Sequence, residues 1–260
     1  MKNKITIIGS GNLGLPLAYG IANSGITTEK VTITRRSENF SEDELQTFNC
    51  TTNNRFAVRG ADIVILAVRP DQLSTLAGEI KDDLENQLVI STITGATILK
   101  LQGLLGADVT IARSMPNIGI KTGNSMTCLA FDEKSLPFKE KVESIFNALG
   151  KTLIISENNF AQATVLCGSG IAIIAKFARA YMQAGIQNGF SEHDALAMAI
   201  QVLKGTVSLL EEGVHPEVMI DKVTTPGGCT ISTLVEMEHQ GFASSLLKSV
   251  ESGVAKAKTL

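Results

Sequence analysis

The chain has 260 residues, 44% of them hydrophobic and 19% charged, with a net charge of −3 at neutral pH. That length allows one large domain or two smaller ones, and the charge gives no indication of nucleic acid or an anionic membrane as a partner. The apolar run Ile5–Ile8 is too short for a signal-peptide core, and the longest uncharged apolar stretch, which ends before Lys176, is too short to span a bilayer. We expect a cytoplasmic protein.

The first part of the chain alternates strand-like and helix-like segments. Strands are predicted at "KITIIG", "VTIT", "ADIVILAV", "LVIST" and "VTIARSM". Helical spacing follows the first strand, in "LGLPLAYGIANSG", and "SEDELQTF" has Ser41 and Glu44 in the spacing of a capping box. "SMTCLAF" and "KTLII" flank a helical "PFKEKVESIFNAL" and are expected to extend the sheet. The alternation predicts a doubly wound parallel sheet with helices on both faces.

The second part contains no convincing strand. Helices are predicted near 191–212 and 231–241, and Ala161 to Ile186 carries only two charges, so that helix must be buried nearly all round. In a domain of about a hundred residues, a helix buried on every side suggests a partner subunit as its cover. We therefore expect a Rossmann-type α/β domain at 1–157, followed by an all-α dimerisation domain at 158–260.

A glycine loop follows the first predicted strand. "IIGSGNLG" places Gly9, Gly11 and Gly14 in G-x-G-x-x-G spacing between a strand and a helix, the context that favours a dinucleotide site. In such a loop the first glycine permits the turn, the second lets the backbone approach a pyrophosphate, and the third lets helix and strand pack closely. A glycine-rich turn without a ligand is the alternative.

The end of the second predicted strand indicates which dinucleotide binds. An NAD site usually has an acidic residue there, whereas this chain has Arg35, Arg36 and Ser37, which offer guanidinium and hydroxyl groups to a 2′-phosphate. A solvated basic pair on a loop is the alternative. We expect NADPH, with NADH possible.

The four cysteines form no C-x-x-C pair, and the three histidines show no metal-binding spacing. We expect reduced, mostly buried thiols and no metal site.

Two threonines, a proline and two glycines interrupt the predicted helices in "DKVTTPGGCTIS", Asp221 to Ser232. Glycines leave room for a small anion, and unpaired amides at the start of the next helix can hold it. A simple turn between helices, with a threonine at a cap position, explains the same residues.

Five segments occur in a fixed order: "GSGNLG", "AVRP" at Ala67–Pro70, "RSMPN" at Arg113–Asn117, "GSG" at Gly168–Gly170 and "TTPGGCT" at Thr224–Thr230. Over nearly the whole chain, this resembles the pyrroline-5-carboxylate reductase family. The resemblance implies NADPH-dependent reduction of a cyclic imine to L-proline, the last step of proline biosynthesis. It also implies a homodimer interlocked by the helical domain, with higher assembly open.

The resemblance carries site residues over by motif. It implies cofactor contacts at the glycine loop, the adenosine phosphate and ribose, and the nicotinamide side: Gly9, Ser10, Gly11, Asn12, Leu13, Gly14, Arg36, Ser37, Asn54, Ala67, Arg69, Pro70, Met115, Pro116 and Asn117. It implies a substrate loop formed by Thr225, Gly227, Gly228, Cys229 and Thr230, with Thr230 as the candidate catalytic residue that donates to or orients the imine nitrogen.

The chain departs from the family pattern at Ile171 and Ile173, where "GSGIAI" replaces a common "GSGPAY". "AVRP" and "TPGGCT" likewise differ from the usual "VKP" and "SPGGTT". Two alternatives therefore stay open. One is a related NADP-linked oxidoreductase that acts on another imine or ketone. The other is a catalytically silent NADP-binding paralogue.

Overall fold

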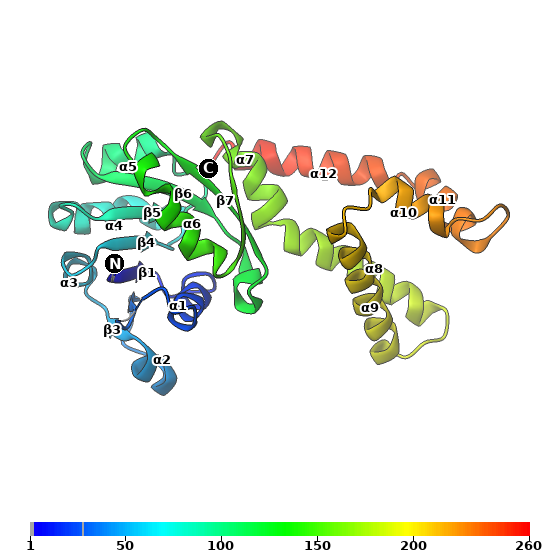
Figure 1. The fold of residues 1–260 in the computed structure, drawn as a ribbon, viewed down its shortest axis with the longest axis horizontal. Helices are drawn as coiled ribbons and strands as arrows, with labels where there is room; N and C mark the ends of the chain where they lie inside the picture. Colours follow the sequence, from blue (N-terminus) through cyan, green and yellow to red (C-terminus); the bar gives the residue numbers. More distant parts are fainter. Residues whose placement is uncertain (1–2, 28) are drawn as a thin grey trace. The chain divides into compact units, whose positions relative to one another are not determined.

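The computed structural model describes residues 3–27 and 29–260, which form two compact units (Figure 1). Unit 1 contains the described residues up to Ile171 together with Gly253–Leu260, and unit 2 is Ala172–Ser252. The predicted domain boundary near residue 157 stays a prediction.

Unit 1 is built on a sheet with the strand order β3-β2-β1-β4-β5-β6-β7-β8. Every neighbouring pair is parallel except β6 and β7, which run antiparallel. The strands are β1 Ile5–Ile8, β2 Thr32–Thr34, β3 Asn49–Thr51, β4 Ile63–Leu66, β5 Leu88–Ser91, β6 Thr110–Met115, β7 Ser125–Phe131 and β8 Gly150–Ile154. The central strands β1, β4 and β5 are buried at every position, as expected for strands covered on both faces.

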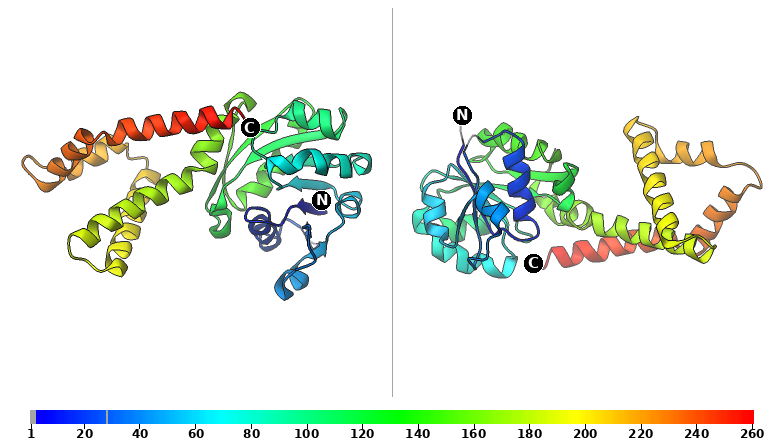
Figure 2. Two further views of the ribbon diagram at one scale, coloured as in Figure 1. Left: turned by 180° about the vertical axis from the view of Figure 1, so that it is seen from behind. Right: turned by 90° about the horizontal axis from the view of Figure 1, so that it is seen from below.

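Helices cover both faces of this sheet (Figure 2). Leu17 of α1 and Phe146 of α6 pack with Ile7 and Ile65 on one face. Helices α3, α4 and α5 pack on the other face. They contact Val64 and the other strand side chains that point to that face, because successive side chains of a strand alternate between the two faces. The helices of unit 1 are α1 Gly14–Asn23, α2 Glu42–Thr47, α3 Asn54–Arg59, α4 Leu73–Ile80, α5 Ile98–Leu105, α6 Lys139–Asn147 and α7 Phe160–Ala163.

All regular structure in unit 2 is helical. Helix α8 (Gly170–Gln187) enters it from unit 1, and α12 (Phe242–Ala257) returns. Between them lie α9 Glu192–Glu211, α10 Pro216–Val223 and α11 Cys229–His239. Ser191 caps α9 by accepting a hydrogen bond from the Asp194 amide, which satisfies one of the unpaired amides at the helix start.

The structure confirms the predicted α/β sheet and the helical second part. The capping box at Ser41 and Glu44 is present. Elements that were not predicted include β3, because "NCT" has no apolar run, α10, although Pro216 stands at a favoured first helical position, and α12. The expected single helix from Ala161 to Ile186 is interrupted by a π-helical turn at Thr164–Gly168.

One helical stretch of the described residues, Glu157–Gln187, is long and apolar enough to cross a membrane by length and composition. The uncharged apolar stretch still ends before Lys176, and the helical stretch reaches this length because it continues past Lys176 and Arg179. Only 17% of its most apolar window is buried within the chain.

Candidate functional site

The predicted cofactor residues lie at or after the carboxyl ends of strands β1, β2, β3, β4 and β6. These strands are parallel to one another in the sheet, so their carboxyl ends meet at one edge. The strand order reverses between β1 and β4, and ligands of open α/β sheets bind at such a point. The fold thus brings together the glycine loop and the segments that begin at Arg36, Ala67 and Pro116.

The three glycines of the loop differ in how much space each has for a side chain. Gly9 has φ +98°, and a Cβ there would lie 2.7 Å from the Ala67 carbonyl oxygen. A Cβ on Gly14 would lie 2.0 Å from the Gly9 carbonyl oxygen, so the tight turn itself excludes a side chain. A Cβ on Gly11 would meet nothing within 4 Å. The loop is therefore open at Gly11, the position where a pyrophosphate approaches the backbone.

Helix α1 begins next to this opening without a capping side chain or an acidic residue in its first turn. Such a helix start presents unpaired amides and a positive dipole end to an anion. The start of the glycine loop is held by β2, because the Gly9 and Ser10 amides both donate to the Thr34 carbonyl oxygen, at 3.2 and 2.8 Å.

Arg35 is occupied within the protein. Its Nε donates to Ser10 Oγ at 3.0 Å, Nη1 donates to the Asn39 carbonyl oxygen at 3.1 Å, and Nη2 pairs with Glu44. The guanidinium also lies over the Phe40 ring, 4.6 Å from its centroid. Arg35 therefore holds the loops after β1 and β2 together.

Glu44 is the buried carboxylate of this arrangement, with 4% of its surface exposed. Burial alone raises the pKa of Glu44, but the Ser41 amide and the Arg35 guanidinium outweigh burial and leave the pKa below its usual value. Glu44 stays ionised at neutral pH and anchors Arg35 in place.

Arg36 differs from its neighbour. It is exposed and makes no hydrogen bond or ion pair with any residue that the structure describes. Ser37 beside it is also exposed and donates to Asn39 Oδ1. Asn54 begins α3, and its Nδ2 donates to Glu79 Oε2 at 3.0 Å. Of the two arginines, Arg36 is the one available for a phosphate.

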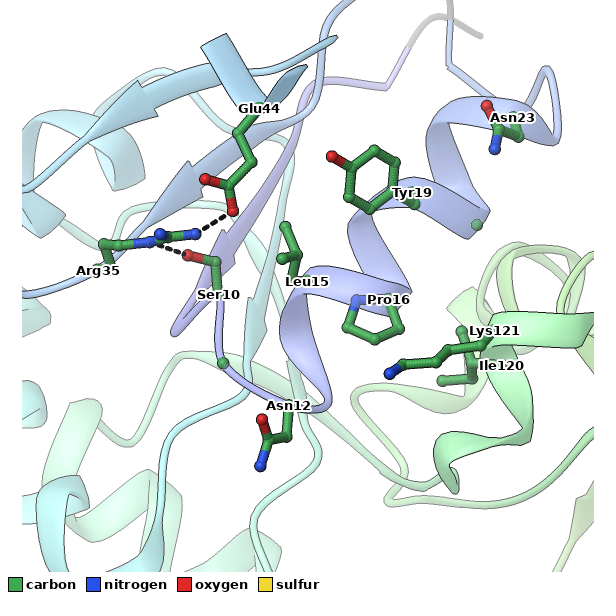
Figure 3. Close-up of a pocket in the computed structure, with 12 residues that line it drawn as sticks. Ser10, Asn12, Leu15, Pro16, Tyr19, Asn23, Arg35, Glu44, Ile120 and Lys121 are labelled. Atoms are coloured by element: carbon green, nitrogen blue, oxygen red, sulfur yellow. Dashed lines mark hydrogen bonds and ion pairs between the residues drawn. The ribbon is translucent and has the colours of Figure 1, made fainter. Parts of the chain in front are cut away.

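A cavity of about 580 Å³ lies on the α1 side of the glycine loop (Figure 3). Ser10, Gly11 and Asn12 are the predicted cofactor residues that line it. The rest of the lining comes from α1, the Arg35–Glu44 pair and the loop at Ile120 and Lys121. The other predicted cofactor residues do not line this cavity.

The segments after β4 and β6, which the resemblance assigns to the nicotinamide side, lie at the same edge of the sheet. Arg69 is exposed, and its guanidinium pairs with Asp71 at 2.8 Å. Asn117 is buried and fully engaged: its amide nitrogen Nδ2 donates to the Cys167 carbonyl oxygen at 3.1 Å, and Oδ1 accepts from the Gly119 amide at 2.9 Å. Its side chain fixes the loop, so only other atoms of the segment are available to a cofactor.

Arg113, on β6, was not predicted as a site residue. Its side chain is 4% exposed; Nη1 donates to Glu157 at 3.0 Å, and the guanidinium lies 4.0 Å from the centroid of the Phe160 ring. Its buried Nε has no partner among the described residues, and burial lowers the pKa of Arg113. Its position in "RSMPN" was the only sequence signal. The contacts fix β6 to the helical stretch that begins at Glu157.

The segment after β5 was also missed. Thr92 and Ile93 follow β5 at the same edge of the sheet; Thr92 Oγ1 donates to the Leu66 carbonyl oxygen at 3.0 Å, which ties this segment to the end of β4. Thr92, Thr94 and Thr97, which follow "LVIS" in the sequence, could have indicated it.

In unit 2, the predicted substrate loop joins α10 to α11. Gly227 has φ +70°, and the Gly228 amide donates to the Thr225 carbonyl oxygen at 3.0 Å. A Cβ on Gly228 would lie 2.5 Å from Thr225 Oγ1. Because the turn itself uses the Gly228 amide, the amides available for an anion are those of Cys229 and Thr230. Helix α11 starts there without a capping side chain.

The threonine hydroxyls of this region fall into two groups. Thr224 donates to the Ile220 carbonyl oxygen at 2.7 Å, and Thr233 donates to the Cys229 carbonyl oxygen at 2.9 Å. The hydroxyls of Thr225 and Thr230 have no hydrogen-bond partner within residues 3–27 and 29–260. The two predicted substrate contacts are therefore the two hydroxyls that the protein leaves free.

Comparisons with known proteins match two parts of the chain to family models. Residues 157–260 match the family described as pyrroline-5-carboxylate reductase dimerisation. Residues 4–95 match the family described as NADP oxidoreductase coenzyme F420-dependent.

Among curated relatives, pyrroline-5-carboxylate reductase 1 of Dictyostelium discoideum is 38% identical over 99% of this chain, which spans half of that longer protein. Pyrroline-5-carboxylate reductase 2 of the same organism is 35% identical, covering 99% of this chain and 93% of the relative. The crystal structure of Plasmodium falciparum pyrroline carboxylate reductase with NADP bound has a TM-score of 0.92 at 28% identity, covering 99% and 97% of the two chains. This chain belongs to the pyrroline-5-carboxylate reductase family.

Proposed function

We propose that this protein reduces 1-pyrroline-5-carboxylate to L-proline with NADPH. The observation that carries the proposal is the pair of free hydroxyls, Thr225 and Thr230, beside the uncapped start of α11. The substrate is a small ring with one carboxylate and one imine nitrogen, so it needs an anion site and one hydrogen-bonding group. The substrate loop offers both.

The cofactor is held along the strand ends of unit 1. The loop from Gly9 to Gly14 receives the pyrophosphate, Arg36 and Ser37 receive the 2′-phosphate, and Asn54 lies toward the adenosine ribose. Ala67, Arg69 and Pro70, with Met115, Pro116 and Asn117, form the nicotinamide side. The exposed and unpaired Arg36 supports NADPH over NADH, because only NADPH carries a phosphate for it.

The substrate carboxylate binds to the amides of Cys229 and Thr230 and to the Thr225 hydroxyl. Thr230 hydrogen-bonds the imine nitrogen and orients it. A protonated imine accepts a hydride directly, so the protein's task is alignment and no strong buried base is required. The loop contains no His, Asp or Glu from Val223 to Ser232, which agrees with this requirement.

Unit 2 is proposed to mediate a homodimer, which covers the exposed apolar faces of its helices. The same cover accounts for the apolar stretch Glu157–Gln187 without a membrane, and we expect the protein in the cytoplasm. Dimers can associate further, but no feature of the described residues determines the number of subunits in a larger assembly.

The test is NADPH oxidation against a panel of cyclic imines: 1-pyrroline-5-carboxylate, 1-pyrroline-2-carboxylate, the six-membered carboxylate and uncarboxylated 1-pyrroline. We expect turnover to be fastest with the 5-carboxylate. Faster turnover of another imine or of a ketone would assign the protein to a related oxidoreductase, the alternative to which Ile171 and Ile173 point. Tight NADPH binding without turnover would identify a silent NADP-binding paralogue.

A further inference from the structure

Two cysteines of unit 1 are in direct contact beside Met115. We propose that Cys128 and Cys167 form a reversible disulfide that controls the nicotinamide side of the cofactor site. Cys128 lies on β7 and Cys167 in the π-helical turn, and their Sγ atoms are 3.4 Å apart. A disulfide holds its sulfur atoms about 2.0 Å apart, so the thiols must approach by about 1.4 Å.

The surroundings suit such a pair. Met115, Ala130, Phe160 and Ala163 enclose the two sulfurs in an apolar cluster. Cys128 is 3% exposed, whereas Cys167 is half-buried and has a route to solvent. The turn that carries Cys167 is π-helical, a local distortion frequent at functional sites. The side chain on the rigid strand therefore stays in place, and the turn provides the movement.

Burial, together with the contact to Cys167, raises the pKa of Cys128 to about 12. Cys128 is therefore a neutral thiol at physiological pH, and Cys167 is the sulfur that meets a soluble oxidant. A hydroperoxide, ROOH, converts the Cys167 thiol to a sulfenic acid and leaves as ROH. The Cys128 sulfur then attacks the sulfenic sulfur. The S–S bond forms, the S–O bond breaks, and the hydroxide leaves with the Cys128 proton as water.

In total, two electrons pass from the two thiols to the peroxide. A dithiol reductant restores both thiols by exchange and is itself oxidised to a disulfide.

The pair is linked to the cofactor site through Asn117. The Cys167 carbonyl oxygen accepts the hydrogen bond from Asn117 Nδ2 at 3.1 Å, and Asn117 in turn holds the Gly119 amide. The next residue of the turn, Gly168, lies over Met115, since a Cβ there would be 3.4 Å from Met115 Sδ. Drawing Cys167 toward Cys128 therefore displaces the partner that fixes the Met115–Asn117 loop.

The remaining two cysteines serve as controls for the oxidation experiment. Cys50, on β3, directs its sulfur at the Glu44 and Phe48 carbonyl oxygens, at 3.5 and 3.9 Å. Cys229 is exposed in unit 2. Neither has a second cysteine beside it among the described residues.

The test for the bond uses the full-length protein, reduced and then treated with hydrogen peroxide. Peptide mass spectrometry should find Cys128 and Cys167 linked with the loss of two hydrogens, and the link should vanish with dithiothreitol. Cys128→Ser and Cys167→Ser should each abolish it, and the matched control Cys50→Ser should retain it. If both thiols remain free while exposed Cys229 is oxidised, the proposal is overturned.

The test for control measures NADPH affinity by fluorescence and then turnover. Oxidation should lower NADPH affinity or kcat/KM about tenfold or more, since a displacement of about 1 Å can cost a hundredfold. Reduction should restore it, and Cys167→Ser should resist the change. If the disulfide-linked protein keeps its NADPH affinity and its turnover, the proposed control of the cofactor site is overturned. The turnover measurement rests on the proposed function. The disulfide and the NADPH affinity are measured without any imine, so their failure can be distinguished from failure of the proposed function.

Discussion

Units 1 and 2 bury their apolar side chains to very different extents. Unit 1 encloses two large apolar clusters, one on each face of the sheet, in which side chains such as Ile7, Leu17 and Val64 are fully buried. In residues 172–252, all of which the structure describes, only Ala195 and Ala199 are buried. Large side chains are exposed on every helix of unit 2, Ile174, Val202, Val223, Val235 and Leu247 among them.

The two units therefore differ in how they can gain stability from burial of apolar surface. A domain gains stability mainly from apolar surface removed from water, at about 25 cal/mol per Å². Unit 1 removes its surface alone, whereas unit 2 leaves extended apolar faces that monomeric proteins rarely expose. We therefore expect unit 2 to complete its core with a second subunit, and the four predictions below test that division in order of decreasing effect.

The largest effect is expected at Ile174 on α8, which is 58% exposed in the single chain. Ile174→Asp should dissociate the dimer or leave the protein aggregated, because an unpaired carboxylate in an apolar interface costs several kcal/mol. Sedimentation should show the dissociation constant raised by at least about a hundredfold.

The matched control for Ile174 is Leu99→Asp in unit 1, where Leu99 is 79% exposed on α5. It should leave the dimer unchanged. A stable wild-type monomer at micromolar concentration, or equal harm from both variants, would end the distinction between the two units.

The second effect concerns the substrate loop. Thr230→Ala should lower kcat/KM about tenfold to a hundredfold, the size of roughly 1.5–3 kcal/mol for a hydrogen bond to a charged group. Steady-state kinetics with 1-pyrroline-5-carboxylate should show this loss with unchanged NADPH affinity and dimerisation.

Thr233→Ala is the control for Thr230, since the Thr233 hydroxyl is already bonded within α11. It should retain activity, and Thr230→Ser should lose much less than Thr230→Ala. Full activity of Thr230→Ala would reduce the loop to a turn between helices.

The third effect distinguishes the two adjacent arginines of unit 1. Arg36→Ala should weaken NADPH binding about tenfold, consistent with about 1.5 kcal/mol for a charged hydrogen bond, and should leave NADH binding unchanged. Arg35→Ala should instead lower thermal stability, because it leaves buried Glu44 without its partner. Binding titrations with both cofactors, alongside melting curves, separate the two roles. Equal losses of NADPH and NADH in Arg36→Ala would contradict the phosphate assignment.

The smallest effect is the acid sensitivity contributed by Glu44. Its folded pKa lies below the unfolded value, so its stabilisation is present above the unfolded pKa, about 4.3, and is lost as the pH falls through the folded pKa. Glu44→Gln should flatten the fall of melting temperature between neutral and acid pH. Exposed Glu42→Gln, on the same helix, should leave that fall unchanged. A melting profile of Glu44→Gln that parallels the wild type would contradict this role.

Local sequence patterns determined several parts of this protein. The buried strand at Ile63–Leu66 follows from a continuous apolar run, the start of α2 from a capping box, and the glycine loop from its spacing between strand and helix. These features depend on residues close in sequence, where propensity and spacing act directly. Thr225 and Thr230 were assigned by the family resemblance, and their roles stay predictions.

The tertiary structure decided the features that depend on distant residues. Strand β3 exists because it pairs with β2, and β7 runs antiparallel beside β6, although neither follows from a local pattern. The unequal roles of Arg35 and Arg36 follow from where Glu44 and Phe40 lie. Cys128 and Cys167 are 39 residues apart in sequence and meet only in the folded chain. Pairing and burial bring such groups together in space, and a linear sequence does not record those distances.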